Sequence, residues 1–322
     1  MRAAVVYQKG QLPKYDSDFA EPKIQNDDEV ILTVKASAIK NLDKLRASGN
    51  HYSMKKIDGP FVVGTDGVGV LEDGRRVYAI GNKGMMAEKA IVSKDNMLEL
   101  PEGISNAVAA ALPNAVMGSG LALRLRAQLK EGEVVLINGA TGVTGKLAIQ
   151  MAKHYGAKKV VATGRNAEVF DELHSLGADE IIPLNGDATA FVAAVKRIHA
   201  QTPIDVVIDY LWGVTAEQIL TALSGNIGYS HRTRYLTVGA LAGDSIVLSS
   251  SILRGTDIQL LGSGLGTWTD AELKQFFSEI LPETFVLAAE DKLKIDILEY
   301  DLEDVEDAWT ADGGGKRIIV QI

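Results

Sequence analysis

Residues 134–150 read VVLINGATGVTGKLAIQ, and no other stretch of the chain carries so much structural information. Strand-forming residues end at Asn138, and glycines follow at three-residue intervals. Apolar residues from Leu147 onward recur with the spacing of a helix face. The stretch therefore predicts a β-strand, a glycine-rich turn and an α-helix in direct succession.

Each glycine of this turn has a predicted task. One permits a tight exit from the strand, one lets backbone N–H groups approach a ligand, and one lets the helix lie against the sheet. Because a helix N-terminus favours anions, we expect a dinucleotide pyrophosphate here. A purely structural turn is the alternative, since the G-x-x-G-x-x-G spacing differs from the commoner G-x-G-x-x-G. The predicted contacts are Gly139, Ala140, Thr141, Gly142, Val143 and Thr144.

From Gly139 onward the chain alternates between predicted strands and helices. Such alternation is typical of an α/β fold with a doubly wound parallel sheet. A complete dinucleotide-binding domain has six such strands. The six predicted here cover residues 134–138, 159–163, 180–182, 204–209, 234–239 and 257–262.

The first hundred residues follow a different pattern. Apolar residues alternate there with a period of two between Gly and Asp turns, which predicts a small antiparallel barrel. The tail returns to β structure and is assigned to the same domain. We therefore predict a barrel domain from residues 1–115 and 263–322, with the dinucleotide-binding domain, residues 116–262, inserted in it. The cleft between the two domains is the expected ligand site.

The composition excludes several classes of protein. The 322 residues suffice for two domains, and a hydrophobic fraction of 46% fits a soluble, core-forming chain. There is no cysteine, so disulfides, thiol nucleophiles and cysteine-based metal sites are ruled out. The five histidines are scattered, and we expect no metal site.

The charge and the hydropathy pattern limit the partners. A net charge of −9 without a basic cluster argues against nucleic acid. No uninterrupted apolar run is long enough to span a membrane, and the first residues lack the apolar core of a signal peptide. We expect a cytoplasmic protein without a membrane partner.

Several motifs together carry a resemblance that covers essentially the whole chain. It resembles the zinc-independent medium-chain dehydrogenases/reductases of the quinone oxidoreductase (zeta-crystallin-like) type. The resemblance implies a Rossmann domain inserted in a GroES-like β-barrel catalytic domain. The matching stretches are IKNLDKLRASG (39–49), VGTDGVGV (63–70), NGATGVTG (138–145), LGAD (176–179), DVVID (205–209) and GKRII (315–319).

Zinc-dependent alcohol dehydrogenases resemble this chain too, but they carry metal ligands that it lacks. They place a Cys where residues 41–43 stand and a His-Glu pair where Thr65 and Asp66 stand. Without a Lewis acid, hydrogen bonds must polarise the acceptor, which suits compounds that are already electrophilic. The predicted activity is hydride transfer from a nicotinamide cofactor to quinones or α,β-unsaturated carbonyls.

The residues at the end of the second predicted strand indicate which nicotinamide cofactor binds. An acidic residue there would bind the ribose of NAD, whereas a cation would meet the 2′-phosphate of NADP. The strand ends in Thr163, Gly164, Arg165 and Asn166. Arg165 can hold a phosphate with two hydrogen bonds, and Thr163 and Asn166 can add others, so we predict NADPH. An exposed loop arginine and a helix-capping asparagine are the alternatives.

The nicotinamide end is expected at the carboxyl ends of the fourth and fifth strands. Backbone groups of Val238, Gly239 and Ala240 are predicted to hold the carboxamide, beside Tyr210. The resemblance adds Ser119, next to the position of a Thr in relatives, and Lys316.

Two residues of the barrel domain are candidates for contact with the acceptor. Asn41 is predicted to contact cofactor or acceptor carbonyl, and Tyr52 to donate a proton or a hydrogen bond. Water is an alternative source of protons. Two other functions stay open: enoyl-thioester reduction, and a non-catalytic NADPH-binding sensor or structural role. The resemblance also implies a homodimer joined through the strand at 257–262.

Overall fold

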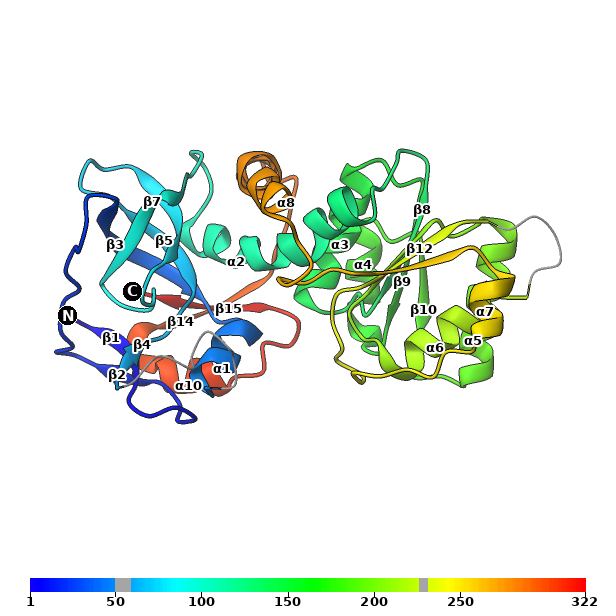
Figure 1. The fold of residues 1–322 in the computed structure, drawn as a ribbon, viewed down its shortest axis with the longest axis horizontal. Helices are drawn as coiled ribbons and strands as arrows, with labels where there is room; N and C mark the ends of the chain where they lie inside the picture. The colour runs from blue at the N-terminus through cyan, green and yellow to red at the C-terminus, as the bar shows by residue number, and fades with distance from the viewer. Residues whose placement is uncertain (50–58, 226–230) are drawn as a thin grey trace. The chain divides into compact units, whose positions relative to one another are not determined.

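The computed structural model describes residues 1–49, 59–225 and 231–322, which form two compact units (Figure 1). Unit 1 contains Met1–Asn114 and Leu281–Ile322, and unit 2 contains Ala115–Ile280. The blue N-terminal and red C-terminal segments thus belong to one unit, as Figure 1 shows. Tyr52 lies outside the described residues.

Unit 2 is built on a six-stranded parallel sheet in the order β10-β9-β8-β11-β12-β13. This order confirms the predicted doubly wound sheet, in which the first strand lies at the centre and the chain crosses over once. Ligands of such sheets bind at the carboxyl ends of the strands that flank the crossover, here β8 and β11. The strands are β8 (Val134–Asn138), β9 (Lys159–Gly164), β10 (Glu180–Pro183), β11 (Val206–Asp209), β12 (Thr233–Thr237) and β13 (Ile258–Gly262).

Helices cover both faces of this sheet. Every residue of β8 is buried, as expected for a central strand with two covered faces. One helix, α3 (Val143–His154), packs on β8 and β9, while α5 (Ala188–Gln201) and α6 (Gly213–Leu223) pack on one another and share a core with Leu136. The shorter helices are η3 (Ala167–Val169), α4 (Phe170–Ser175), α7 (Ser250–Gly255), α8 (Asp270–Gln275) and η4 (Phe276–Ile280).

Unit 1 contains two sheets, a barrel-like one and a smaller one. Strands β3, β5, β6 and β7 are antiparallel, and a further β3–β7 pairing closes them on one another. The smaller sheet has the order β2-β1-β4. The strands are β1 (Ala3–Val6), β2 (Lys14–Asp16), β3 (Glu29–Ala38), β4 (Phe61–Val62), β5 (Asp66–Val70), β6 (Arg76–Gly81) and β7 (Lys89–Glu99).

The tail returns to unit 1, but it departs from a purely antiparallel barrel. Strand β15 (Arg317–Gln321) pairs antiparallel with β3, and β14 (Ile297–Asp301) pairs parallel with β15. A parallel pair needs a crossover, which η5 (Leu302–Asp304) and α10 (Val305–Thr310) supply. The other helices of unit 1 are α1 (Asn41–Ala47), α9 (Leu281–Ala289) and most of α2 (Asn106–Val116), whose last two residues belong to unit 2.

Residues 263–280 depart from the predicted domain boundary. We expected them in the barrel domain, but they belong to unit 2. The reason is a set of polar contacts: Arg126 donates to the carbonyl oxygen of Gly262 at 3.3 Å and pairs with Glu272 at 3.2 Å, and Arg124 pairs with Glu279 at 3.3 Å. These contacts hold the segment to the end of the helix that passes from unit 1 into unit 2.

That helix runs from Asn106 to Arg126 and changes character along its length. It is α-helical up to Val116, with Pro113 inside, and a π-helix (η2) from Met117 to Arg126. By length and composition it is the one helix in the described residues that could cross a membrane, but 67% of its apolar window is buried inside the protein, as in a core helix. Cytoplasmic residence stays a prediction.

Candidate functional site

The glycine turn, residues 139–145, has the geometry that the sequence predicts for a nucleotide loop. Gly139 leaves β8 with a φ of 89°, a conformation that favours glycine. A Cβ on Gly145 would come within 2.6 Å of both Ala140 Cα and the carbonyl oxygen of Gly139, so only glycine lets α3 lie this close to the turn. A Cβ on Gly142 would meet no atom within 4 Å. The space beside Gly142 is therefore open.

Gly142 is also the N-cap of α3, and no side chain caps this helix end. The first N–H groups of a helix have no intrahelical partner, and the helix dipole adds positive potential there. The neighbouring Thr141, Val143 and Thr144 are half-buried, whereas Ala140 is fully buried inside the turn. The turn thus offers N–H donors and open space at one point, which fits a pyrophosphate group.

Behind the turn, a row of buried polar side chains joins the carboxyl ends of three strands. Asn138 lies opposite Thr163 of β9 and opposite Asp209 of β11, and all three side chains are fully buried. The Thr163 hydroxyl donates to Asn138 Oδ1 at 2.8 Å, and Asn138 Nδ2 donates to Asp209 Oδ1 at 2.7 Å. We call these three residues the polar row.

The polar row changes the role predicted for Thr163. Its hydroxyl also accepts a 3.1 Å hydrogen bond from the backbone N–H of Gly139. Because this oxygen is buried and bonded on both sides, it orders the glycine turn and does not reach a phosphate. The prediction that the Thr163 side chain contacts NADPH is therefore not supported by its position.

The loop after β9 carries the predicted cofactor-selecting residues. Arg165 is exposed and forms no ion pair with any residue that the structure describes. Asn166 accepts a 3.1 Å hydrogen bond from the N–H of Glu168 and caps η3, which is the capping alternative noted for it. A Cβ on Gly164 would lie 2.3 Å from Thr141 Cγ2, so this loop packs directly against the glycine turn. The loop therefore leaves a cationic side chain available near the turn.

A second group of predicted residues converges on Gly118 in the π-helix. A Cβ there would lie 2.8 Å from Thr144 Cγ2 and 3.7 Å from Val238 Cγ1. The Tyr210 hydroxyl donates to the Gly118 carbonyl oxygen at 2.7 Å. Burial raises the pKa of Tyr210 well above its ordinary value, so the hydroxyl remains a donor.

Ser119 does not join this group. It is fully buried, and its hydroxyl donates to the carbonyl oxygen of Ala115 one helical turn earlier, at 2.7 Å. Its side chain is thus used within the helix. The contact predicted for Ser119 has no support from this geometry, whereas Gly118 faces the residues that were expected there.

The loop after β12 lies against the end of β11. The N–H groups of Val238 and Gly239 both donate to the carbonyl oxygen of Asp209, at 2.8 and 3.2 Å. A Cβ on Gly239 would lie 2.7 Å from the Tyr210 carbonyl oxygen, and Ala240 is exposed. Because their N–H groups are used, Val238 and Gly239 can offer only carbonyl oxygens to a ligand.

The backbone just after β11 is strained. Trp212 has a φ of 56° and a ψ of −151°, a conformation that non-glycine residues rarely adopt. Asp209 holds it in place, because its Oδ1 accepts from the N–H groups of Leu211 and Trp212 at 2.8 and 3.0 Å. Strained backbone of this kind concentrates at ligand sites. Asp209 thus shapes the end of β11, where the nicotinamide is expected.

Asn41 and Lys316, two of the predicted contacts, belong to unit 1. Asn41 is the first residue of α1 and is exposed. Lys316 is also exposed and closes a turn by donating its N–H to the carbonyl oxygen of Gly313 at 2.9 Å. Tyr52 falls outside the described residues. The roles of these three residues remain predictions.

Unit 1 also contains a buried ionic cluster that the sequence analysis missed, formed by Lys40, Asp43, Asp66 and Tyr78. Lys40 is 3% exposed, and its Nζ lies 3.3 Å from Asp43 Oδ2 and hydrogen-bonds Asp66 Oδ1. Tyr78 donates to Asp66 Oδ2 at 2.7 Å. Burial lowers the pKa of Lys40, but the two carboxylates raise it by more, so the net direction is upward and Lys40 is an ammonium.

This Lys40 cluster occupies the two motifs that carry the metal ligands in zinc-dependent relatives. Asp43 belongs to the first motif and Asp66 to the second. Within residues 1–49, 59–225 and 231–322, no group of three or more His, Cys, Asp or Glu side chains could hold a metal ion. The two carboxylates instead surround an ammonium.

Comparison with known proteins gives the family. A family model described as zinc-binding dehydrogenase matches residues 143–281. The quinone oxidoreductase of Sus scrofa is 30% identical over 288 residues, which cover 85% of this chain and 83% of the relative. The chloroplastic NADPH-dependent alkenal/one oxidoreductase of Arabidopsis thaliana is 35% identical over 189 residues, covering 52% of this chain and 47% of the relative.

A solved structure agrees over the whole chain. The quinone oxidoreductase from Thermus thermophilus, also solved in complex with NADPH, is 28% identical, with a TM-score of 0.78 and 100% coverage of both chains. These matches confirm the resemblance inferred from the motifs. The chain belongs to the quinone oxidoreductase family of the medium-chain dehydrogenases/reductases.

Proposed function

We propose that this protein is an NADPH-dependent oxidoreductase that transfers hydride to quinones or α,β-unsaturated carbonyls without a metal ion. The observation that carries the proposal is the glycine turn, with the uncapped N-terminus of α3 and the open space at Gly142. The relatives support the same activity, since their names describe quinone reduction and NADPH-dependent alkenal reduction.

The cofactor fits the described residues at three points. The N–H groups at the start of α3 would bind the pyrophosphate. Arg165 would pair with the 2′-phosphate, and the carbonyl oxygens of Val238 and Gly239 would accept from the carboxamide. When bound, NADPH supplies the hydride, and the protein orients it and excludes water.

The Lys40 cluster supports chemistry without zinc. Two aspartates at the positions of the metal-ligand motifs already hold an ammonium, so a divalent cation there would meet a positive charge. Hydrogen-bond donors must then polarise the carbonyl of the acceptor, and we propose that Asn41 is such a donor. Quinones and enones suit such a site because they accept hydride without strong Lewis-acid help.

The first experiment measures NADPH oxidation by the purified protein with a benzoquinone, a phenanthrenequinone and an unsaturated aldehyde. We expect turnover with at least one acceptor and no loss after treatment with a metal chelator. Turnover that disappears with chelator and returns with zinc would contradict the metal-free mechanism. Tight NADPH binding with no turnover of any acceptor would instead favour the sensor or structural role.

The second experiment tests the cofactor preference with Arg165→Gln. Loss of a charge-assisted contact should lower kcat/KM for NADPH by roughly 10- to 100-fold and leave the value for NADH nearly unchanged. The control is Arg254→Gln, which removes an exposed arginine of α7. An equal loss for both cofactors would show that Arg165 does not read the 2′-phosphate.

We also propose a homodimer joined through β13. This strand ends the parallel sheet, and Leu260 on it is 38% exposed. An open sheet edge with an exposed apolar side chain favours pairing with a second copy. Light scattering should give twice the chain mass for the natural protein and a monomer for Leu260→Lys, and a monomeric natural protein would reject the proposal.

A further inference from the structure

A buried carboxylate at the carboxyl end of β11 has no cation beside it. The side chain of Asp209 is fully buried. It takes part in none of the ion pairs found among the residues that the structure describes. Burying a charge costs free energy unless hydrogen bonds or an opposite charge compensate for it. A neutral side chain of the same shape would avoid that cost.

Four hydrogen bonds keep Asp209 ionised. Its Oδ1 accepts from Asn138 Nδ2 at 2.7 Å, and from the N–H groups of Leu211 and Trp212 at 2.8 and 3.0 Å. Its Oδ2 accepts from the Tyr235 hydroxyl at 2.6 Å. Burial raises the pKa of Tyr235 well above its ordinary value, and the Asp209 carboxylate raises it further, so the phenol keeps its proton and donates it. Both carboxylate oxygens are therefore acceptors, and the side chain carries a negative charge.

The hydrogen bonds of the polar row also fix the orientation of the Asn138 amide. The N–H of Gly139 can only donate, so the Thr163 hydroxyl accepts from it and donates its own hydrogen to Asn138 Oδ1. Asn138 Nδ2 is thus left to donate to Asp209. The glycine turn and the carboxylate therefore belong to one ordered set of hydrogen bonds.

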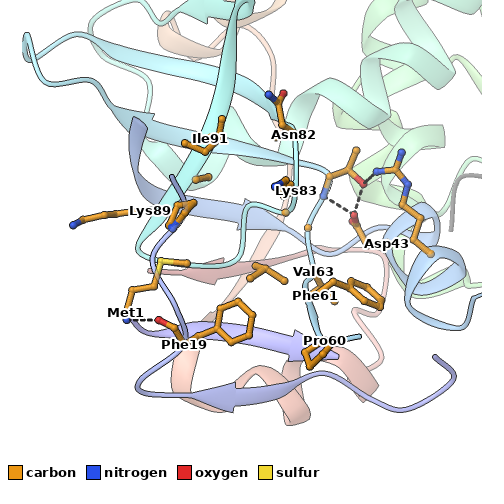
Figure 2. A pocket seen from close by; sticks show the side chains of 18 of the residues that line it. Met1, Phe19, Asp43, Pro60, Phe61, Val63, Asn82, Lys83, Lys89 and Ile91 are labelled. Atoms are coloured by element: carbon orange, nitrogen blue, oxygen red, sulfur yellow. Dashed lines mark hydrogen bonds between the residues drawn. The ribbon is translucent and has the colours of Figure 1, made fainter. Parts of the chain in front are cut away.

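The buried carboxylates of unit 1 are arranged differently. Figure 2 shows Asp43 on the wall of a cavity of about 530 Å³. There the Nζ of Lys40 lies 3.3 Å from Asp43 Oδ2 and also bonds Asp66, so an ammonium accompanies the two carboxylates. Asp209 has only neutral donors. Neutral donors stabilise a charge without cancelling it, so the field of Asp209 extends beyond its contacts.

This charge lies where the proposed function expects the nicotinamide. The N–H groups of Val238 and Gly239 both donate to the backbone carbonyl oxygen of Asp209. The carbonyl oxygens of the same two residues are the proposed partners of the carboxamide. Strands β8 and β11 also flank the crossover of the sheet, beside which ligands bind. The charge of Asp209 therefore acts on the reactive end of the cofactor.

We propose that Asp209 favours the positively charged nicotinamide ring of NADP⁺ over the neutral ring of NADPH. This inference rests on the proposed function. When hydride, two electrons and one proton, passes to a quinone or an enone, the nicotinamide ring is left with a positive charge and the reduced acceptor takes a proton from water. A buried carboxylate stabilises that charge as it develops, and so lowers the barrier to hydride transfer.

The experiment measures the dissociation constants of NADPH and NADP⁺ for the full-length protein by titration calorimetry, without an acceptor. Asp209→Asn removes the charge and keeps the shape, because an amide can still accept from Leu211 and Trp212 and donate to Tyr235. We expect NADP⁺ to lose roughly three- to tenfold in affinity relative to NADPH. Asp205→Asn, which neutralises a carboxylate at the opposite end of β11, is the control and should keep the natural ratio.

A second variant keeps the charge and removes one of its donors. Tyr235→Phe should retain the natural ratio or raise the preference for NADP⁺, and it is informative even if Asp209→Asn fails to fold. Three outcomes would each overturn the inference: equal affinity losses for both nucleotides in a folded Asp209→Asn variant, an equal shift in Asp205→Asn, or a shift toward NADPH in Tyr235→Phe. These outcomes leave the proposed reductase activity standing, whereas a natural protein that binds neither nucleotide would overturn both.

Discussion

The hydroxyl of Tyr210 donates a 2.7 Å hydrogen bond to the carbonyl oxygen of Gly118. The two residues are far apart in the chain, and the bond ties the end of β11 to the π-helix η2. π-helical segments leave backbone groups without their usual helical partners, and they recur at functional sites. Here a buried phenol bonds a carbonyl oxygen of the π-helix, beside the side chains of Thr144 and Val238.

Tyr210→Phe should lower the free energy of unfolding by about 1 kcal/mol, because the Gly118 carbonyl oxygen loses its donor in a half-buried position. Urea denaturation measures the change. Tyr7→Phe is the control, since the Tyr7 hydroxyl bonds Asp16 at an exposed position. If both variants lose the same free energy of unfolding, the bond to Gly118 stabilises the protein no more than an exposed hydrogen bond does.

The glycine turn predicts opposite outcomes for two neighbouring substitutions. Gly142→Ala should fold normally, because its Cβ meets open space at a φ of −87°, yet it should weaken NADPH binding by roughly tenfold, because the methyl group occupies the phosphate side. Gly145→Ala should lose about 1–3 kcal/mol of stability, because its Cβ lies 2.6 Å from backbone atoms of the turn.

Calorimetric NADPH titration and thermal melting check both variants. Gly186→Ala is the matched control, since a Cβ there also meets open space but lies in a loop away from the turn sequence. Unchanged NADPH affinity in Gly142→Ala would mean that the phosphate does not approach this helix end.

Lys40→Met should destabilise the protein by about 3–5 kcal/mol at neutral pH, because it leaves the Asp43 and Asp66 carboxylates buried near each other without their ammonium. Proton uptake by a carboxylate then relieves the repulsion in the folded state. The deficit should shrink as the pH falls from about 7 to about 5, where the folded variant binds more protons than the unfolded chain. Chemical denaturation across this pH range measures the deficit. Lys158→Met, at an exposed lysine, is the control. A deficit that does not vary with pH would argue against buried, unpaired carboxylates.

We predict that the free energy of unfolding falls in mild acid because of His199. Burial lowers its pKa first, and His231 adds to this, while Asp205 opposes it. The backbone N–H of Ile204 donates to His199 Nδ1 at 3.0 Å, which requires an unprotonated nitrogen. The folded state therefore binds fewer protons than the unfolded state below the ordinary pKa of 6.5, so unfolding becomes easier as the pH falls through that region.

His199→Asn should reduce this pH dependence, because its amide oxygen can accept from Ile204 without titrating. Urea denaturation between about pH 7.5 and pH 5.5 gives the slopes to compare. His174→Asn, at an exposed histidine of α4, is the control and should keep the natural slope. Identical slopes for the natural protein and His199→Asn would refute the assignment.

Local pattern predicted the parallel sheet well. Strand β8 has the predicted bounds, Val134–Asn138, because a strand buried on both faces must be continuously apolar and a glycine must end it. The barrel was predicted less closely, as a class of sheet, and its strands include pieces as short as β4, Phe61–Val62. Short, half-buried strands are set by their pairing partners, which sequence periodicity does not reveal.

Two residues whose surroundings the sequence did not reveal, Thr163 and Lys40, have partners far away in the chain. The Thr163 hydroxyl could serve a phosphate or a neighbour, and only the register of β8 with β9 brings Asn138 beside it. Lys40 is an ordinary surface residue by type, and its burial depends on Asp66, 26 positions later. Glycine spacing, by contrast, reports local backbone geometry, so the turn was predicted correctly.

The division of unit 1 between the two ends of the chain has a consequence for biosynthesis. Strand β15 leaves the ribosome later than β3, its pairing partner, and unit 2 is made in the interval between them. At ordinary elongation rates that interval is of order ten seconds, long enough for a domain of this size to fold first. The nascent β3 edge stays unmatched during that time, and a truncated product would expose it permanently to chaperones and proteases.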